Sequence, residues 1–188
     1  SNGEVGESST FTSELQNPQP FYFGGDQMAE NWNGMLDDIA IWDRALSASE
    51  VSALHSGGIP APGGGGGPLV PGLIAYWDFD DASQIEGGTV VDLVAGIEGE
   101  VLGDTAAVEG HLGGAVDFGE TPAGNWIRVD AADNPWLEAA SDANALSVSL
   151  WQKLHSRVSS STFWFGAASA NNGERNFQAH IPWGGGDI

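Results

Sequence analysis

The sequence has no cysteine and very few basic residues. Disulfide bonds and thiolate chemistry are therefore excluded, which is compatible with a bacterial extracellular protein. Only 5 of the 188 residues are Lys or Arg, against 26 Asp or Glu, so the formal net charge is −21. Nucleic acids and anionic membranes are bound through Lys and Arg, so we expect neither as a partner. The acidic charge instead suits divalent cations and keeps the protein soluble.

Long apolar runs are also missing. No run approaches the ~18 residues that a membrane-spanning helix requires, so we expect no membrane insertion. The first residues lack the basic start and apolar core of a secretory signal peptide, so an exported protein would carry its signal upstream of Ser1. What the chain does contain is 28 Gly, 8 Trp and 8 Phe, a composition that favours β structure with many tight turns.

One helix is expected, over about residues 47–56. Ser47 is a suitable N-cap, and Glu50, three residues later, completes a capping box. Leu46 and Val51 are placed to form the hydrophobic staple of such a helix. The helix is expected to end at Gly57-Gly58.

The rest of the chain is expected to form short strands separated by turn residues. Many short strands without helices between them are typical of an antiparallel, two-sheet jelly roll sandwich, so the predicted fold class is all-β. The expected strands are Phe21–Phe23, Met35–Trp42, a strand that starts at Leu73, Thr89–Val91, Glu98–Leu102, Ala115–Phe118, Trp126–Asp130, Leu146–Gln152, Thr162–Gly166 and Asn176–Ile181.

A glycine- and proline-rich stretch, Ile59 to Pro68, divides the chain and cannot form regular structure. Ahead of it, Gly34-Met-Leu-Asp-Asp-Ile-Ala-Ile-Trp is followed by Arg44-Ala-Leu-Ser and the capped helix. Behind it come Ala75-Tyr-Trp-Asp-Phe-Asp-Asp, then Gly113-Gly-Ala-Val-Asp-Phe, then Leu146-Ser-Val-Ser-Leu-Trp.

In these segments the chain resembles the laminin-G-like domains of bacterial surface proteins, whose fold is the concanavalin A-like jelly roll. The segment that begins at Gly34 resembles the family's end, and the segments after the linker resemble its beginning. The resemblance therefore implies three parts: 1–57 as the C-terminal part of one domain, 58–72 as a linker, and 73–188 as the N-terminal part of another.

The order of these parts, end before beginning, has three explanations. The chain is a window of a tandem array, or it is a circularly permuted domain, or the beginning of one copy completes the end of another copy. The first is preferred. Exchange of strands between copies is second, because it would build a filament without additional interfaces.

The resemblance also implies a structural calcium ion where the first and last strands of such a domain meet. It places Asp37 and Asp80 near the ion, and Asp92 is a further candidate ligand, with Asp78 and Asp81 behind it. Calcium prefers several carboxylate and carbonyl oxygens, which these acids and the glycine-rich turns can supply. The alternative is that these acids only solvate strand ends and cap turns.

Glycan contacts are expected near the C-terminal end of the sequence. Trp183 offers a stacking surface, and Asn176, Gln178 and His180 share one face of a predicted strand and can donate hydrogen bonds. The alternative, that His180 and Trp183 serve packing, is weighted more heavily. The closest acid pair at strand spacing, Glu98-Gly-Glu100, lies in a glycine-rich hairpin without aromatic neighbours, so we expect no glycosidase activity and no other enzyme.

The predicted function is that of a non-catalytic structural or adhesive module. It would belong to a secreted, multidomain bacterial surface protein or extracellular filament. Its expected partners are other copies of the protein or neighbouring laminin-G-like domains, with polysaccharide as a further possibility. The alternative is a carbohydrate-binding module of a secreted glycoside hydrolase.

Overall fold

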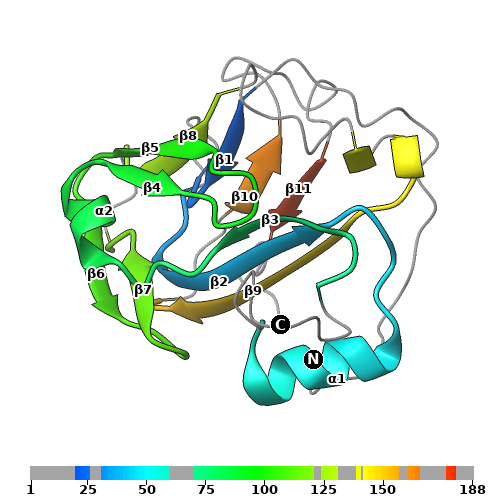
Figure 1. Ribbon diagram of the computed structural model, residues 1–188. Coiled ribbons are helices and arrows are strands. Elements are labelled where there is room, and N and C mark those ends of the chain that lie inside the picture. The colour runs from blue at the N-terminus through cyan, green and yellow to red at the C-terminus, as the bar shows by residue number, and fades with distance from the viewer. Residues whose placement is uncertain are drawn as a thin grey trace.

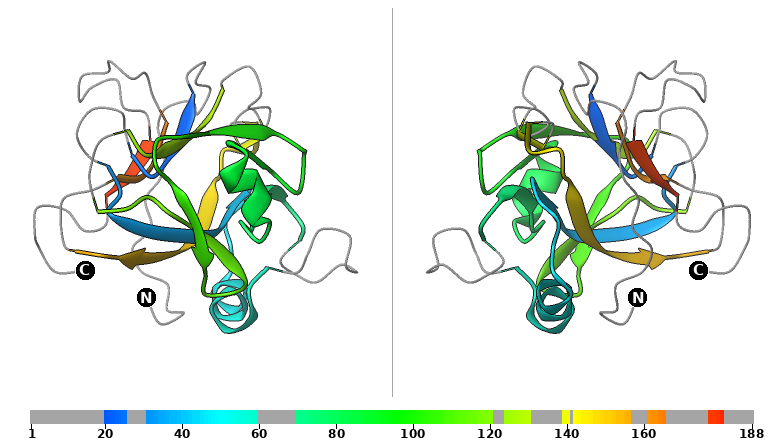
Figure 2. Two further views of the ribbon diagram at one scale, coloured as in Figure 1. Left: turned by 90° about the vertical axis from the view of Figure 1, so that its left-hand side faces the viewer. Right: turned by 90° about the vertical axis from the view of Figure 1, so that its right-hand side faces the viewer.

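The computed structural model describes residues 20–25, 31–59, 70–120, 124–130, 139–140, 142–156, 161–165 and 177–180. The strands among these residues form two antiparallel β-sheets that face each other (Figures 1 and 2). The predicted all-β jelly roll sandwich is therefore confirmed. Apart from four residues at 139–140 and 142–143 that form a short helical turn, the described residues contain two helices, α1 (Ala48–Gly57) and α2 (Ala82–Glu86).

The first sheet has six strands in the order β11-β10-β1-β8-β5-β4. Each neighbouring pair in this sheet is antiparallel. The strands are β1 (Phe21–Phe23), β4 (Thr89–Val91), β5 (Glu98–Leu102), β8 (Trp126–Val129), β10 (Ser161–Phe165) and β11 (Phe177–His180).

The second sheet is built around one long strand, β2 (Gly34–Trp42). One edge of β2 pairs with β9 (Ser147–Leu154) over most of its length. The other edge of β2 pairs with two strands in turn. The start of β2 pairs with β7 (Gly114–Asp117), and the end of β2 pairs with β3 (Leu73–Trp77). β6 (Ala106–Glu109) then pairs with β7 as a hairpin.

The two strands that precede the glycine- and proline-rich stretch are central in their sheets. β1 lies between β10 and β8, and β2 lies between β9 and the β3 and β7 pair. Residues on both sides of the stretch thus share one pair of sheets within one chain, as in the permuted explanation. The boundaries at 1–57, 58–72 and 73–188, and the choice among the three explanations, stay predictions.

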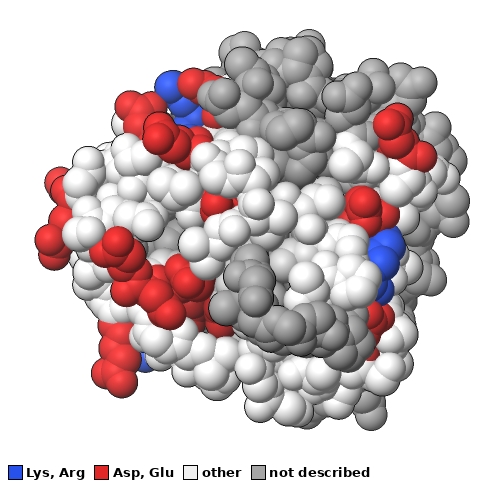
Figure 3. All heavy atoms as spheres, in the orientation of Figure 1, with Lys and Arg blue, Asp and Glu red and all other residues white. Residues whose placement is uncertain are grey.

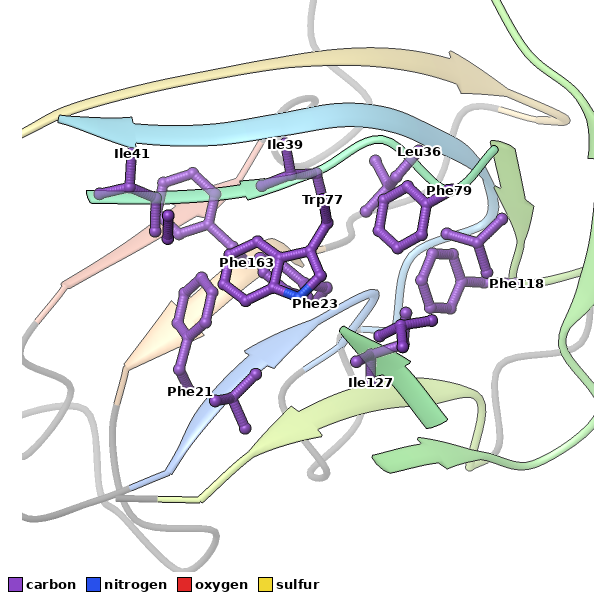
Figure 4. Packing of buried hydrophobic residues seen from close by; sticks show 14 of the residues in the cluster. Phe21, Phe23, Leu36, Ile39, Ile41, Trp77, Phe79, Phe118, Ile127 and Phe163 are labelled. Carbon is purple, nitrogen blue, oxygen red and sulfur yellow. The ribbon is translucent and has the colours of Figure 1, made fainter. Parts of the chain in front are cut away.

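Aromatic and branched side chains fill the space between the sheets (Figure 4). Trp77 of β3 contacts Phe23 of β1 edge to face, with ring centroids 4.8 Å apart, so one residue from each sheet meets at the centre. Pairs of this kind add to the stabilisation that comes from burial alone. Other fully buried residues here include Phe21, Leu36, Ile39, Ile41, Phe118 and Ile127.

Helix α1 begins and ends as predicted. Ser47 accepts a hydrogen bond from the Glu50 backbone N–H, and Glu50 accepts one from the Ser47 backbone N–H, which together form the capping box. Leu54 is buried in a second, smaller apolar cluster with Ala40, Trp42, Leu73 and Tyr76. The cluster lies under α1, which sits on the outer side of the second sheet, away from the first sheet (Figure 1).

Two elements were not predicted. Helix α2 is only five residues long and is capped by Asp81, which accepts a hydrogen bond from the Ser83 backbone N–H. Strand β6 has the sequence Ala-Ala-Val-Glu, which has little β propensity of its own. It is a strand because its whole length pairs with β7.

Candidate functional site

Two adjacent acids, Asp37 and Asp38, lie in the middle of β2, at the point where its neighbour changes from β7 to β3. A regular strand would place them on opposite faces. Here the register against β9 shifts between Asp37 and Ala40, so two residues of β2 oppose the single residue Leu150. Asp38 takes the left-handed backbone conformation, with φ of 51°, which Asp tolerates better than most residues.

This β-bulge puts both carboxylates on the outer face. Leu36 and Ile39, three residues apart, both lie in the main core, so Asp37 and Asp38 are both excluded from it. The sequence alone predicts a regular alternation, with Asp37 on the same face as Ile39 and Ile41, and the bulge shows that this prediction is wrong. Asp37 and Asp38 are nevertheless only 3% and 5% exposed.

The carboxylate of Asp37 holds the hairpin between β6 and β7. Its Oδ2 accepts hydrogen bonds from the backbone N–H groups of His111 at 2.7 Å and Leu112 at 3.2 Å. Its Oδ1 is buried and has no partner among the described residues. Burial, together with the neighbouring charge of Asp38, raises the pKa of Asp37 to about 6, despite the two backbone donors.

The carboxylate of Asp38 faces helix α1. Its Oδ1 accepts a hydrogen bond from the hydroxyl of Tyr76, which belongs to the apolar cluster under α1. Its Oδ2 is buried without a partner among the described residues. Burial raises the pKa of Asp38, and the charges of Asp80 and Asp78 add to this effect. Burial likewise raises the pKa of Asp78.

Each acid opens to a different cavity. Asp38 lines a cavity of about 480 Å³ whose other walls come from α1, from β9 and from strands β10 and β11. Asp37 lines a smaller cavity of about 350 Å³ between β2, β9 and the β6–β7 hairpin. Trp151 of β9 lies between the two cavities and lines both.

Two imidazole rings flank the ring of Trp151. The ring centroid of His111 lies 3.9 Å from that of Trp151, and the centroid of His55, from α1, lies 5.6 Å from it. The contacts join α1, β9 and the β6–β7 hairpin on the outer face. Because His111 lies against the ring, that surface of Trp151 is not open for stacking a sugar.

Strand β9 has one edge that pairs with no other described strand. Seven of its eight residues pair with β2, and none pairs with another described strand. The larger cavity is lined both by residues of β9 from the outer face, Ser149 and Trp151, and by residues from the inner face, Val148 and Leu150. The cavity therefore follows this edge around both faces of the strand.

The structure brings two of the three predicted calcium ligands to one place. Asp80 accepts a hydrogen bond from the Gly114 backbone N–H, so Asp80 and Asp37 both contact the β6–β7 hairpin. Asp92 lies elsewhere: its two carboxylate oxygens accept hydrogen bonds from the backbone N–H groups of Tyr76, Val94 and Ala95.

A calcium site would therefore draw on Asp37 and Asp80 more readily than on Asp92, whose oxygens are already engaged. The described residues contain no group of three or more carboxylate or imidazole side chains placed to hold a metal ion. A site built on Asp37 and Asp80 would need backbone carbonyls to complete its ligands. Calcium binding stays a prediction.

Two of the four predicted glycan-binding residues lie outside the described part of the chain. Asn176 and Trp183 are not among the described residues. Gln178 and His180 belong to β11, where they pair with Trp164 and Ser161 of β10. This pairing places the two residues on the edge strand of the first sheet and leaves their predicted role untested.

Several residues of the site were not singled out from the sequence. Asp38, Tyr76, His111 and Trp151 meet only because β2, β3, β9 and the β6–β7 hairpin come together on the outer face. One signal was available: two adjacent acids inside an otherwise apolar strand, because buried acids are costly and are retained for a reason.

Among the charged side chains on the face drawn in Figure 3, acidic ones predominate and basic ones are few. This agrees with the net charge of −21. Among the described residues, no helix has the length and apolar character needed to cross a membrane.

A comparison with protein families supports the fold. A family model described as the concanavalin A-like lectin/glucanases superfamily matches residues 1–52, a range that includes β1, β2 and the first turn of α1. This superfamily comprises carbohydrate-binding and structural modules, and its laminin G-like domains are typically extracellular and generally non-catalytic. No curated protein and no solved structure matches the chain. Residues 1–52 are thus similar to the concanavalin A-like lectin/glucanase superfamily, in agreement with the laminin-G-like resemblance of the sequence.

Proposed function

We propose that the protein is a non-catalytic structural or adhesive module of a secreted, multidomain bacterial surface protein or filament. It would act by contacting other copies of itself or neighbouring laminin-G-like domains. The single observation that supports this function is strand β9, which pairs with β2 on one edge, pairs with no other described strand on its second edge, and borders a cavity that follows that second edge. An open edge strand is a template for pairing with another strand.

The placement of the acids supports a role without catalysis. A glycosidase requires two carboxyl groups that face one substrate. Asp37 and Asp38, the most strongly buried adjacent acids, open to different cavities and so cannot flank one glycosidic bond. Glu100, one of the pair at strand spacing, forms an ion pair with Arg128 at 2.9 Å.

A bead-adhesion assay tests this function. Beads coated with the protein are expected to adhere to one another and to keep adhering when free mono- and oligosaccharides are added. The same preparation is screened on a glycan array. Adhesion that free sugar abolishes, or array binding without adhesion between beads, would contradict the proposal.

The alternative, a carbohydrate-binding module of a secreted hydrolase, would be favoured by array binding that Trp183→Ala removes. Trp183 is the residue from which the sequence predicts stacking on a sugar. A buried residue of the core should not be changed in place of Trp183, because its substitution could unfold the protein and so reduce every kind of binding.

A further inference from the structure

The larger cavity contains one group that calls for a positively charged partner. Asp38 is 5% exposed, lines this cavity, and has one carboxylate oxygen without a partner among the described residues. A buried carboxylate with an unsatisfied oxygen is costly, and an ammonium group removes that cost. The other side of the cavity is the edge of β9 that pairs with no other described strand.

The chain itself carries a suitable cation on the same strand. Lys153 is the only lysine in the sequence, and it lies near the end of β9. It pairs with Met35 of β2, which puts its side chain on the outer face, the face that also carries Asp38. Lys153 is exposed and makes no ion pair with any described residue.

We propose that two copies of the protein pair through β9, edge to edge and antiparallel, and that Lys153 of each copy binds Asp38 of the other. The partner is thus a second copy of this chain. This inference rests on the proposed function, which it deepens by naming the contact.

The register follows from symmetry. In an antiparallel pair of identical strands related by a two-fold axis, the residue on the axis faces the same residue of the second copy. A residue a given number of positions after it faces the residue the same number of positions before it in the second copy. With Trp151 on the axis, Lys153 faces Ser149 of the second copy. All three residues lie on the outer face of the second sheet. The second sheets of the two copies would therefore join into one continuous sheet whose outer faces lie on the same side.

Ser149 leaves room for the lysine to pass. It pairs with Ala40, beside the bulge that contains Asp38, and both side chains are small. An added strand would lie roughly 10 Å from β2, since neighbouring strands are spaced ~4.8 Å apart. A lysine side chain spans about 6 Å, and the aspartate side chain and the ion pair cover the remainder. The lysine of one copy therefore reaches the carboxylate of the other.

The proposed contact is reciprocal, and this gives a sharp test. Asp38→Asn keeps an acceptor for Tyr76 and suits the left-handed backbone at this position, while Lys153→Gln changes an exposed side chain. Neither change touches the main core, and far-UV circular dichroism checks that each variant is folded. Asp104→Asn makes the same chemical change at an exposed acid and serves as the control.

Sedimentation velocity over a concentration series is the measurement. The unmodified protein and Asp104→Asn are expected to dimerise with similar affinity. Each of Asp38→Asn and Lys153→Gln alone should weaken the dimer about tenfold or more, because both ion pairs are lost and one charge of each is left unpaired. An equal mixture of the two variants should dimerise more tightly than either alone, because the mixed pair keeps one intact Lys153–Asp38 contact.

The other outcomes overturn the inference. If the unmodified protein stays monomeric up to millimolar concentration, there is no such dimer. If it dimerises but neither variant changes the affinity, or the mixture does no better than its parts, the contact is wrong. In each case bead adhesion still decides the proposed function separately, because beads can adhere through surfaces other than β9.

Discussion

The hydroxyl of Tyr76 donates a hydrogen bond to Oδ1 of Asp38, and both residues are buried. They belong to β3 and β2, which lie on opposite sides of the glycine- and proline-rich stretch. The bond therefore links the two parts of the chain at the point where β2 changes its neighbour. Burial raises the pKa of the Tyr76 hydroxyl, and the hydrogen bond to Asp38 raises it further because it requires the neutral phenol.

Removal of this hydroxyl should destabilise the fold. Tyr76→Phe leaves both oxygens of the buried Asp38 without a donor, and such a loss costs about 1–3 kcal/mol. We expect a decrease of that size in the free energy of unfolding, measured by urea denaturation at neutral pH. The double variant Tyr76→Phe/Asp38→Asn should lose less than the single variant, because the charge that required the donor is gone. Equal stability of Tyr76→Phe and the unmodified protein would show that the bond contributes nothing.

Stability should rise on mild acidification because of Asp37. The folded-state pKa of Asp37 is about 6, and the ordinary pKa of an aspartate side chain is 3.8. Between these two pH values the folded state retains a proton that the unfolded state has lost. The unfolded state then binds fewer protons, so stability falls as pH rises through this window. The raised pKa values of Asp38 and Asp78 act in the same direction.

Asp37→Asn removes this dependence while it keeps an acceptor for the backbone N–H groups of His111 and Leu112. In buffer with a chelator we expect the variant to be more stable than the unmodified protein at neutral pH, by on the order of 1–3 kcal/mol. The difference should vanish near pH 4. Thermal denaturation across this pH range measures both curves, and curves that stay parallel would show that Asp37 is not buried as described.

The local features of the fold could be predicted from the sequence. These features depend only on residues that are close together in the sequence, so the sequence pattern is enough to predict them. They are the capping box at Ser47 and Glu50, the glycines that end α1, and the short aromatic strands. The order of the strands and the bulge at Asp38 could not be predicted, because they depend on which strands lie beside β2. Strand β6 illustrates the same limit, since its residues become a strand only through β7.

The candidate site was predictable only in part. Asp37 and Asp80 were expected to lie together, and both contact the β6–β7 hairpin. Asp92 was grouped with them because of its charge, but its carboxylate holds the turn that follows β4 and the edge of β3. The sequence shows which residues are acidic, but only the folded structure shows which backbone N–H groups each carboxylate binds.

The N-cap of α1 should contribute measurably to stability. Ser47→Ala removes the acceptor for the Glu50 backbone N–H, and losses of this kind cost about 1 kcal/mol. Ser52→Ala, on an exposed position within the same helix, is the control and should be neutral or slightly stabilising. Chemical denaturation of the two variants side by side measures the difference. Similar losses for both would mean that the cap is not formed in solution.

Glu50 should make the same helix sensitive to acid. The hydrogen bonds from Arg44 and then from Ser47 lower the pKa of Glu50 to about 2, and its ion pair with Arg44 has an N–O distance of 2.6 Å. A group whose pKa is lowered on folding stabilises the fold above its unfolded pKa, here 4.5, and loses that effect as pH falls toward 2. Glu50→Gln should therefore reduce stability at neutral pH and have no effect near pH 2, which thermal denaturation at the two pH values checks.

Calcium should stabilise the fold if Asp37 and Asp80 bind it as predicted. An ion that binds only the folded state, at a concentration about a hundred times its dissociation constant, adds about 2.7 kcal/mol to the free energy of unfolding. For a chain of this length that corresponds to a rise in Tm of roughly 5–10 °C. We expect differential scanning fluorimetry to record such a rise in millimolar calcium and its reversal by a chelator. Asp80→Asn should abolish the rise, because it removes one ligand while the hairpin keeps its bond to Asp37. Asp92→Asn should retain the rise on a lower baseline, since Asp92 holds backbone groups away from the hairpin. An equal rise in Asp80→Asn, or none in the unmodified protein, would place calcium elsewhere or exclude it, and loss of the rise in Asp92→Asn alone would return Asp92 to the ligand set.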